Sequence, residues 1–470
     1  MHILPYNVRI VKYAKWRIIM TEIKQENKMG VMPIPKLLIT MSLPMILSML
    51  VQALYNIVDS IFVAQLSEDA LTAVSLAFPI QNLMIAVAAG TGVGINALLS
   101  RSLGEKKYDK VNRIAQNGIL LGVISGIVFA IAGIFGSRLF FLAQTKDPEI
   151  VKYGTDYMTI ITVASIAIFM QITFERLMQS TGKTIFNMIT QGIGAIINII
   201  LDPILIFGWF GLPRLEVRGA ALATIIGQFV AVILGIILNQ KFNKEVHISF
   251  KGFRPCKKTI SAIYKIGVPS ILMQSIGSVT TFGMNNILLM FSSTAATVFG
   301  VYFKLQSFIF MPIFGLTNGI IPIVAYNYGA RNKKRIYQTI KLGSFIAIGI
   351  MGAGMLAFQI FPKIFLELFD ASEKMMRIGV PALRIISLSF VFAGFCIVCS
   401  ATFQALGNGI YSLIMSVARQ LVVILPVAFL FAKVFGLDMV WYAYPIAEIA
   451  SLGVCVILLR RILKQKVDVL

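Results

Sequence analysis

The chain has 470 residues, of which 57% are hydrophobic and only 13% are charged, and its mean hydropathy is +0.84. A soluble domain carries about 25% charged residues, so this composition indicates a polytopic membrane protein instead. The net charge of +22 does not indicate nucleic-acid binding, because no such motif is present and Lys and Arg lie between apolar runs, where topology requires them.

The chain begins with a basic stretch, residues 1–36, that we expect to form a cytoplasmic tail. Residues 1–19 contain no long apolar core, so they are not a signal peptide. We interpret them as a disordered extension or as a mis-assigned start, because Met20 begins a more usual polar approach to the first apolar segment.

Long apolar segments and short polar loops then alternate, which predicts an all-α protein with twelve transmembrane helices. Six of them form a predicted N-lobe (37–240), and six form a C-lobe (266–462) after a cytoplasmic loop (241–265); residues 463–470 form a cytoplasmic tail. The segments are 38–62, 70–99, 115–137, 153–175, 185–210, 219–240, 266–291, 297–326, 340–362, 380–403, 412–435 and 440–460.

The Lys and Arg residues are divided unequally between the two sides of these segments. One side, which includes both tails and residues 241–265, carries 30 of them, and the other carries nine. Cytoplasmic loops are enriched in Lys and Arg, so we expect both termini in the cytoplasm.

The two lobes are tandem copies of one unit. A shift of 225 residues places Pro44 on Pro269, Gln81 on Gln306, and Gly104 on Gly329 without a gap. Six helices per copy is an even number, so both copies have the same orientation and are related by an axis along the membrane normal.

Two helices of the first copy carry acids with polar neighbours. Gln52, Asn56 and Asp59 follow i, i+4, i+7 spacing and are expected on one face of the first helix. Asn198 and Asp202 share a face of the fifth helix, and Pro203 leaves the Ile199 carbonyl without its backbone donor. Since an ionisable group facing lipid is costly, we expect the two polar faces to meet.

Such a cluster suits exchange of a small cation. Its carboxylate and amide oxygens could bind H⁺ or Na⁺, and two acids at low dielectric cannot easily both be ionised. Asp59, Asp202 and Asn198 are therefore the predicted ion-coupling residues and a possible Na⁺ site. The alternative is a hydrogen-bond cluster that only holds helices together.

Further polar residues are candidates for the same site. Tyr157 could donate a hydrogen bond into the cluster or could be an interfacial aromatic residue. For Glu175 we favour a helix end salt-bridged to Arg176, with a substrate contact as the alternative. Thr224 follows a Gly/Ala run and is expected at a helix contact.

The second copy lacks the two aspartates, because Met284 and Val427 stand in their places. Its own buried charges are Lys304, Arg384, Arg419 and Glu448. Lys304–Glu448 or Arg419–Glu448 could form a structural pair, and Arg384 could lie near the outer face. Without a histidine nearby, the Cys396-x-x-Cys399 spacing is interpreted as packing, not as a redox or metal site.

Taken together, these motifs resemble the multidrug and toxic compound extrusion (MATE) family, in its DinF-like bacterial branch, over residues 30–462. The residues that carry the resemblance are Ser42–Pro44, Asp59, Leu71–Pro79, Gln179–Gly182, Asn198–Pro203, Gly219–Thr224, Gly315–Gly319 and Ala325–Gly329. The NorM-like branch places acids in its second lobe, but the seventh helix here has Asn285 and Asn286 and no acid. Coupling through that helix is therefore not carried over.

The resemblance implies two six-helix lobes around a V-shaped cavity and export of cationic, lipophilic drugs in exchange for H⁺ or Na⁺. It implies ion coupling at Asp59 and Asp202, with Gln52, Asn56, Tyr157, Asn198 and Thr224 around them. We expect a monomer with no cofactor, nucleic-acid partner or enzymatic activity, because no nucleophile–base pair or metal-ligand set is present. The alternative is a flippase for lipid-linked sugars or a polysaccharide exporter of a related fold, which would need cationic residues such as Lys304 and Arg419 in the cavity.

Overall fold

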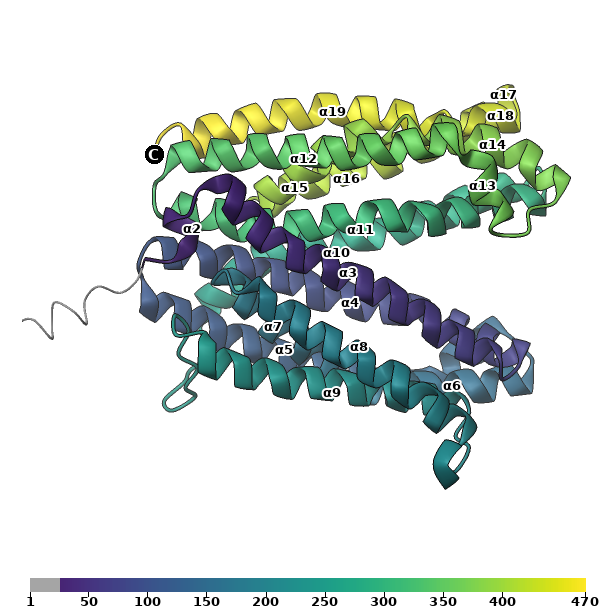
Figure 1. Ribbon diagram of the computed structural model, residues 1–470, viewed down its shortest axis with the longest axis horizontal. Helices are drawn as coiled ribbons and strands as arrows, with labels where there is room; N and C mark the ends of the chain where they lie inside the picture. Colours follow the sequence, from purple (N-terminus) through teal and green to yellow (C-terminus); the bar gives the residue numbers. More distant parts are fainter. Residues whose placement is uncertain (1–25) are drawn as a thin grey trace, which may run out of the picture.

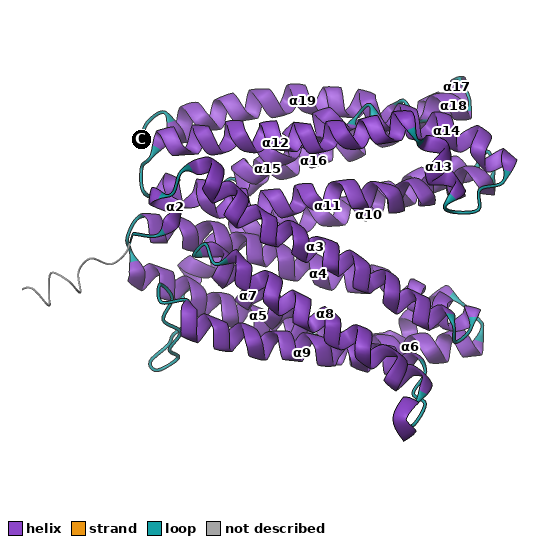
Figure 2. Cartoon of the chain, viewed as in Figure 1, coloured by secondary structure: helices purple, strands orange, loops and turns teal. Residues whose placement is uncertain are grey.

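The computed structural model describes residues 26–470, and within that range the chain consists of helices and loops without a β-strand (Figure 2). The all-α prediction is confirmed. The interpretation of residues 1–19 lies outside the described residues. Every predicted apolar segment coincides with one helix or with a group of consecutive helices.

The helices form two bundles of six spans each, which follow one another in the chain (Figure 1). The first bundle consists of α3 (Ile34–Ala64), α4 (Glu68–Gly104), α5 (Tyr108–Gln144), α6 (Pro148–Val163) with α7 (Ile166–Ser180), α8 (Thr184–Phe207) and α9 (Val217–Phe242). The second consists of α10 (Lys257–Leu289), α11 (Ser293–Gly329), α12 (Lys333–Ile360), α14 (Glu373–Ser387) with α15 (Phe390–Ala405), α16 (Gly409–Val417) with η2 (Ala418–Ile424) and α17 (Leu425–Val434), and α19 (Ala443–Ile462). Short helices complete the chain: α2 (Lys28–Val31), η1 (Trp209–Gly211), α13 (Pro362–Glu367), α18 (Leu437–Val440) and η3 (Leu463–Val467).

Most of these spans are long and apolar enough to cross a bilayer. Eight spans of the described chain meet these criteria without a break, if α16, η2 and α17 are counted as one continuous span. Two bent helix pairs raise the number to ten. α10 and α19 lie alongside them and complete the twelve. The bends also obey the internal repeat: α6 and α7 meet at 44°, and α14 and α15 meet at 47°. Each bend therefore belongs to the repeated unit.

The two bundles approach each other at the end where α2 and the C-terminus lie, here called the terminus side, and diverge in a V toward the opposite side (Figure 1). Glycines make the closest contacts. A Cβ atom at Gly104 would overlap the carbonyl oxygen of Tyr326, and a Cβ at Gly329 would overlap that of Arg101. Because Gly104 and Gly329 are counterparts in the repeat, α4 and α11 cross symmetrically.

The Gly90-Thr-Gly92-Val-Gly94 segment of α4 serves the same closure. A Cβ at Gly90 would collide with Ile271, and one at Gly94 with the carbonyl of Ile263, both on α10. Since only hydrogen atoms fit between these backbones, this glycine run is a close-packing element.

A polar clamp on the same side joins α7 to α11. One guanidinium nitrogen of Arg176 donates to Gln179 Oε1 at 2.6 Å and to Asn318 Oδ1 at 2.9 Å. Gln179 in turn donates from its amide to the backbone carbonyl of Asn318. The clamp therefore joins side chains of both bundles.

The segment Asn27–Met32, here called the strap, also spans the two bundles. On the first bundle, Asn27 Nδ2 donates to Thr181 O at 2.9 Å and to Glu245 Oε1 at 3.2 Å. On the second bundle, Arg335 donates to the backbone carbonyls of Met29 (3.0 Å) and Met32 (2.7 Å). The strap thus holds both bundles together at the terminus side.

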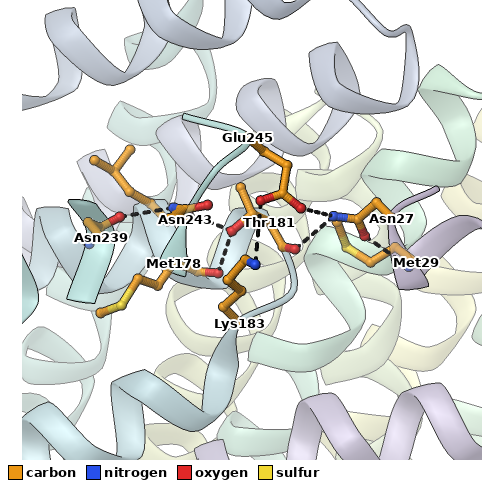
Figure 3. A network of polar contacts seen from close by, with 9 residues as sticks. Asn27, Met29, Met178, Thr181, Lys183, Asn239, Asn243 and Glu245 are labelled. Carbon is orange, nitrogen blue, oxygen red and sulfur yellow. Dashed lines mark hydrogen bonds and ion pairs between the residues drawn. The ribbon is translucent and has the colours of Figure 1, made fainter. Parts of the chain in front are cut away.

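Figure 3 shows how the first-bundle end of the strap is anchored. Glu245, in the loop between the bundles, accepts from Asn27 and lies 3.5 Å from Lys183 Nζ. In the same view, Asn243 Nδ2 donates to Asn239 Oδ1 at 2.9 Å, next to Thr181. The loop between the bundles therefore takes part in closing the terminus side.

Replacing Arg335 by Gln should destabilise the protein, because the shorter neutral side chain cannot reach both strap carbonyls. Hydrogen bonds that involve a charged group contribute about 1.5–3 kcal/mol, so we expect a melting temperature lower by a few degrees in detergent. Arg331→Gln, an exposed neighbour, is the control. Equal shifts for the two variants would contradict a stabilising role of the strap.

Candidate functional site

A cavity of about 80 Å³ lies inside the first bundle, between α3, α4, α7, α8 and α9. Gly194 and Gly227 belong to its wall, and here α8 and α9 approach so closely that a Cβ at Gly227 would lie 2.6 Å from the Gly194 carbonyl. Its wall is partly apolar and includes polar side chains from several helices, namely Gln52, Tyr55, Gln171, Gln191, Asn198, Thr224 and Gln228. The cavity has room for water, a small cation or one cationic head group, but not for a whole drug, which needs about 300 Å³ or more.

Glu175 is only 5% exposed and lies behind two residues of the cavity wall, Gln171 and Gln191. Its Oε1 accepts from Gln171 Nε2 at 3.1 Å and its Oε2 from Gln191 Nε2 at 2.8 Å. Ser48 donates to the amide oxygen of Gln191 and fixes its orientation. The carboxylate thus keeps lone pairs for a cation, because each of its oxygens can accept more than one hydrogen bond.

The favoured interpretation of Glu175 as a salt-bridged helix end is wrong. Arg176 turns away from it toward the clamp with Gln179 and Asn318. The physical reason is that successive helix residues point about 100° apart, so Glu175 faces the cavity while Arg176 faces the second bundle.

The aspartate of α8 lies directly beyond Asn198. Asp202 is fully buried, and its Oδ1 accepts from Asn198 Nδ2 at 3.3 Å. The same amide nitrogen lies 3.3 Å from Thr224 Oγ1 of α9. Asn198 therefore connects Asp202 to the cavity, and the sequence-predicted neighbours Asn198, Asp202 and Thr224 lie together.

The aspartate of α3 lies near the same group. Asp59 is close enough to Asp202 for the two charges to repel each other, and it is within electrostatic range of Tyr55 and Tyr157. Tyr157 is 2% exposed, and its hydroxyl accepts from Gln81 Nε2 at 2.9 Å. Its own O–H proton therefore remains available to the carboxylates.

Three oxygen atoms of this group are buried without a hydrogen-bond partner: Asp59 Oδ1, Asn198 Oδ1 and Asp202 Oδ2. A buried acceptor without a donor is costly, and carboxylates inside membranes are compensated by a partner. Protons or a small hard cation would supply that partner. Among the described residues no three His, Cys, Asp or Glu side chains converge, so a cation here would also need the Asn198, Thr224 or backbone oxygens.

One predicted neighbour lies elsewhere. Gln52 lines the cavity, but the side chain of Asn56 is exposed. At about 100° per residue, Tyr55 and Asp59 lie to one side of Gln52 and Asn56 to the other. Asn56 is therefore not part of the cavity wall, where Tyr55 takes that place, and its role as a substrate contact stays a prediction.

Sequence reasoning missed Gln171, Gln191 and Gln228 on the cavity wall. The available signal was the spacing of Gln171 and Glu175, which are i, i+4 on one helix and therefore share a face. For Gln191 the sequence gives no such signal, because only the packing of α7 against α8 brings it to Glu175.

The four charged residues of the second bundle that were predicted to be buried are dispersed, and two of them, Lys304 and Arg384, are exposed, which corrects that prediction. Of the two pairs considered for Glu448, Arg419–Glu448 is present at 2.9 Å. The Lys304 ammonium instead lies 5.9 Å from the centre of the Phe369 ring. Arg384 is exposed and donates to the Gln359 carbonyl at 3.2 Å, and Cys396 and Cys399 are buried in the apolar core with free thiols.

Comparison with known proteins gives the same family twice along the chain. The family model described as MatE matches residues 44–204 and residues 269–430, one match in each bundle. Multidrug export protein MepA of Staphylococcus haemolyticus (strain JCSC1435) is 30% identical over 414 residues, which cover 88% of this chain and 90% of that protein. MepA of Staphylococcus aureus (strain MRSA252) is 29% identical over 419 residues, covering 88% and 91%.

Solved structures agree with these relatives. A structure described as MATE in complex with MaL6 superimposes with a TM-score of 0.88 at 26% identity, covering 94% of this chain and 99% of that one. A second, described as the outward-facing conformation of a multidrug resistance MATE family transporter of the MOP superfamily, has a TM-score of 0.88 at 25% identity and covers 94% and 98%.

Proposed function

Because this chain belongs to the MatE family, we propose that it is a multidrug efflux transporter that exports lipophilic organic cations in exchange for H⁺ or Na⁺. The observation that carries the exchange is the group of unsatisfied oxygens on Asp59, Asn198 and Asp202. Empty, the acids attract a cation; loaded with a proton or Na⁺, they no longer do. Competition for one group of oxygens is sufficient for antiport.

The site residues divide into two roles. We assign ion coupling to Asp59, Asp202 and Asn198, with Tyr157 as a hydrogen-bond donor. Gln52, Thr224 and Glu175 contact the cationic part of the substrate at the cavity wall. The small volume of the cavity supports this division, because only the charged head fits there and the apolar body must remain between the bundles.

Alternating access uses the two bundles as moving parts. The glycine crossings, the clamp and the strap close the terminus side in the present conformation. We propose that this side faces the cytoplasm, because 30 of the Lys and Arg residues border it in the sequence-derived topology. This conformation is therefore the one that releases substrate to the outside. We propose that the protein carries out transport as a monomer in a bacterial membrane.

The charge of the site supports a cation exporter over a lipid-linked sugar flippase. A pyrophosphate would need uncompensated cationic side chains, but Arg419 is paired with Glu448 and Lys304 is exposed near Phe369. The three acids of the first bundle would repel such a substrate.

Efflux from proteoliposomes tests the proposal. We expect ethidium to be transported against its gradient when a proton gradient alone, or a sodium gradient alone, is imposed, and not when neither is present. The gradient that drives efflux identifies the coupling ion. Ethidium transport that is equally fast without any gradient would contradict antiport. Translocation of a lipid-linked sugar by vesicles that transport no ethidium would favour the flippase.

A further inference from the structure

The second bundle contains a buried ion pair at the place where the first bundle has its cavity. Arg419, in the π-helix η2, donates to Glu448 Oε1 of α19 at 2.9 Å, and their side chains are 23% and 9% exposed. A π-helix inside a longer helix frequently marks a functional position. The first bundle has an arginine–aspartate pair of the same length, Arg218–Asp156, but it is much less buried, with side chains 57% and 24% exposed.

The repeat shows which first-bundle residues the pair replaces. The 225-residue shift places Arg419 on Gly194, a cavity-wall glycine. For the last helix, a shift of 224 places five buried positions of α9 on five buried positions of α19. The pairs are Gly219 with Ala443, Ala221 with Pro445, Ala223 with Ala447, Gly227 with Ser451, and Ala231 with Cys455. With that shift Glu448 stands in the place of Thr224, so both partners are counterparts of cavity-wall residues.

Other counterparts of the wall bond to one another instead of facing a cavity. Gln420 Nε2 donates to Ser416 Oγ at 2.8 Å, and Thr280 lies 3.2 Å from Gln420 Oε1. In the first bundle their places are taken by Ala195, Gln191 and Tyr55. Thr280, Ser416 and Gln420 therefore occupy, with their own side chains, places whose counterparts line the first-bundle cavity, and the Arg419–Glu448 pair brings charges to two further such places.

The pair retains features of a cation site. Glu448 Oε2 is buried and has no hydrogen-bond partner, so the carboxylate has an unused acceptor. Tyr302 and Tyr444 lie within electrostatic range of the pair, with their ring centres 6.1 Å apart. A carboxylate with nearby aromatic rings suits a monovalent cation.

We propose that Arg419 is a specificity-determining residue, a tethered cation that occupies the second bundle's copy of the cavity and so confines exchange of mobile cations to the first bundle. The inference rests on the proposed function, because it specifies which of two equivalent places is open to ions. The chemical class that the place would accept without Arg419 is a small monovalent cation with planar or ammonium character.

The guanidinium ion, the group that Arg419 supplies, is the probe. In Arg419→Gly, which restores the glycine of the first bundle, a few millimolar guanidinium should raise the melting temperature by several degrees relative to the same concentration of K⁺. The reconstituted variant should also take up radiolabelled guanidinium several-fold faster than the wild type. Arg419→Lys should behave as the wild type, and Arg419→Gly with Glu448→Gln should lose both responses.

Ethidium efflux, measured in the same vesicles, separates this inference from the proposed function. If the wild type transports ethidium but guanidinium neither stabilises nor enters Arg419→Gly in a Glu448-dependent manner, the inference is overturned and the proposed function remains. If the wild type transports no ethidium under any gradient, the proposed function fails. Should Arg419→Gly fold only with guanidinium present, that rescue is itself the expected binding, and failure to fold with guanidinium overturns the inference.

Discussion

Asp202→Asn is expected to abolish gradient-driven efflux while the protein still folds. The amide has nearly the same shape as the carboxyl group, so the contact with Asn198 at 3.3 Å can persist, but the side chain can no longer exchange a proton or neutralise a cation. Coupling between two ligands is typically about 1–3 kcal/mol, or roughly 5- to 150-fold in affinity. We expect the whole of that coupling to disappear.

Proteoliposomes loaded with ethidium provide the measurement, under the gradient that drives the wild type. Asp156→Asn is the matched control, since Asp156 is an aspartate of the same bundle that pairs with Arg218 at 2.9 Å away from the cavity. It should retain nearly all activity. Full coupled export by Asp202→Asn would remove the basis of the exchange scheme.

Gly329→Val should nearly stop transport by a different route, because it prevents closure of the terminus side. A Cβ at this position would overlap the backbone carbonyl of Arg101, which cannot move aside as a side chain could. Overpacking typically costs about 1–3 kcal/mol, and the cost falls only on the conformation in which the bundles meet. The population of that conformation should drop about tenfold or more, since 1.4 kcal/mol corresponds to a factor of ten.

Two readouts distinguish this effect from unfolding. Efflux should fall, while a cysteine introduced at Asn318 in the clamp should react faster with a water-soluble maleimide on the terminus side. Gly352→Val is the matched control, because nothing lies within 4 Å of a Cβ at Gly352. Wild-type efflux and labelling rates in Gly329→Val would show that the glycine crossing does not limit closure.

The sequence predicted the spans well because a bilayer imposes a length and a polarity that hydropathy records directly. It did not predict the bends at Ala164–Ser165 and Leu388–Ser389, which contain neither proline nor glycine. Those bends follow from how α6/α7 and α14/α15 pack against neighbouring helices, and packing partners are absent from a linear pattern.

The candidate site, like the fold, was predicted from the sequence only in part. Asn198 and Asp202 share a helix face, so spacing alone joined them, and the cost of a charge in lipid turned that face inward. Spacing alone did not separate Asn56 from the cavity-wall residues of α3, because a difference of a few tens of degrees around the helix decides between cavity and exposure. The position of Glu175 depends on Gln171 and on Gln191 of another helix, and no single-helix rule contains that contact.

The symmetric crossing of α4 and α11 has a consequence for the origin of this architecture. Gly104 meets the backbone at Tyr326, and Gly329 meets it at Arg101. The two contacts are counterparts, because Gly104 and Gly329, and likewise Arg101 and Tyr326, are 225 residues apart. Two separate copies of the ancestral six-helix unit could therefore have sealed against each other as a homodimer before their genes fused. Each contact needs only a glycine and a backbone carbonyl, so this seal does not depend on the side chains in which the two halves differ.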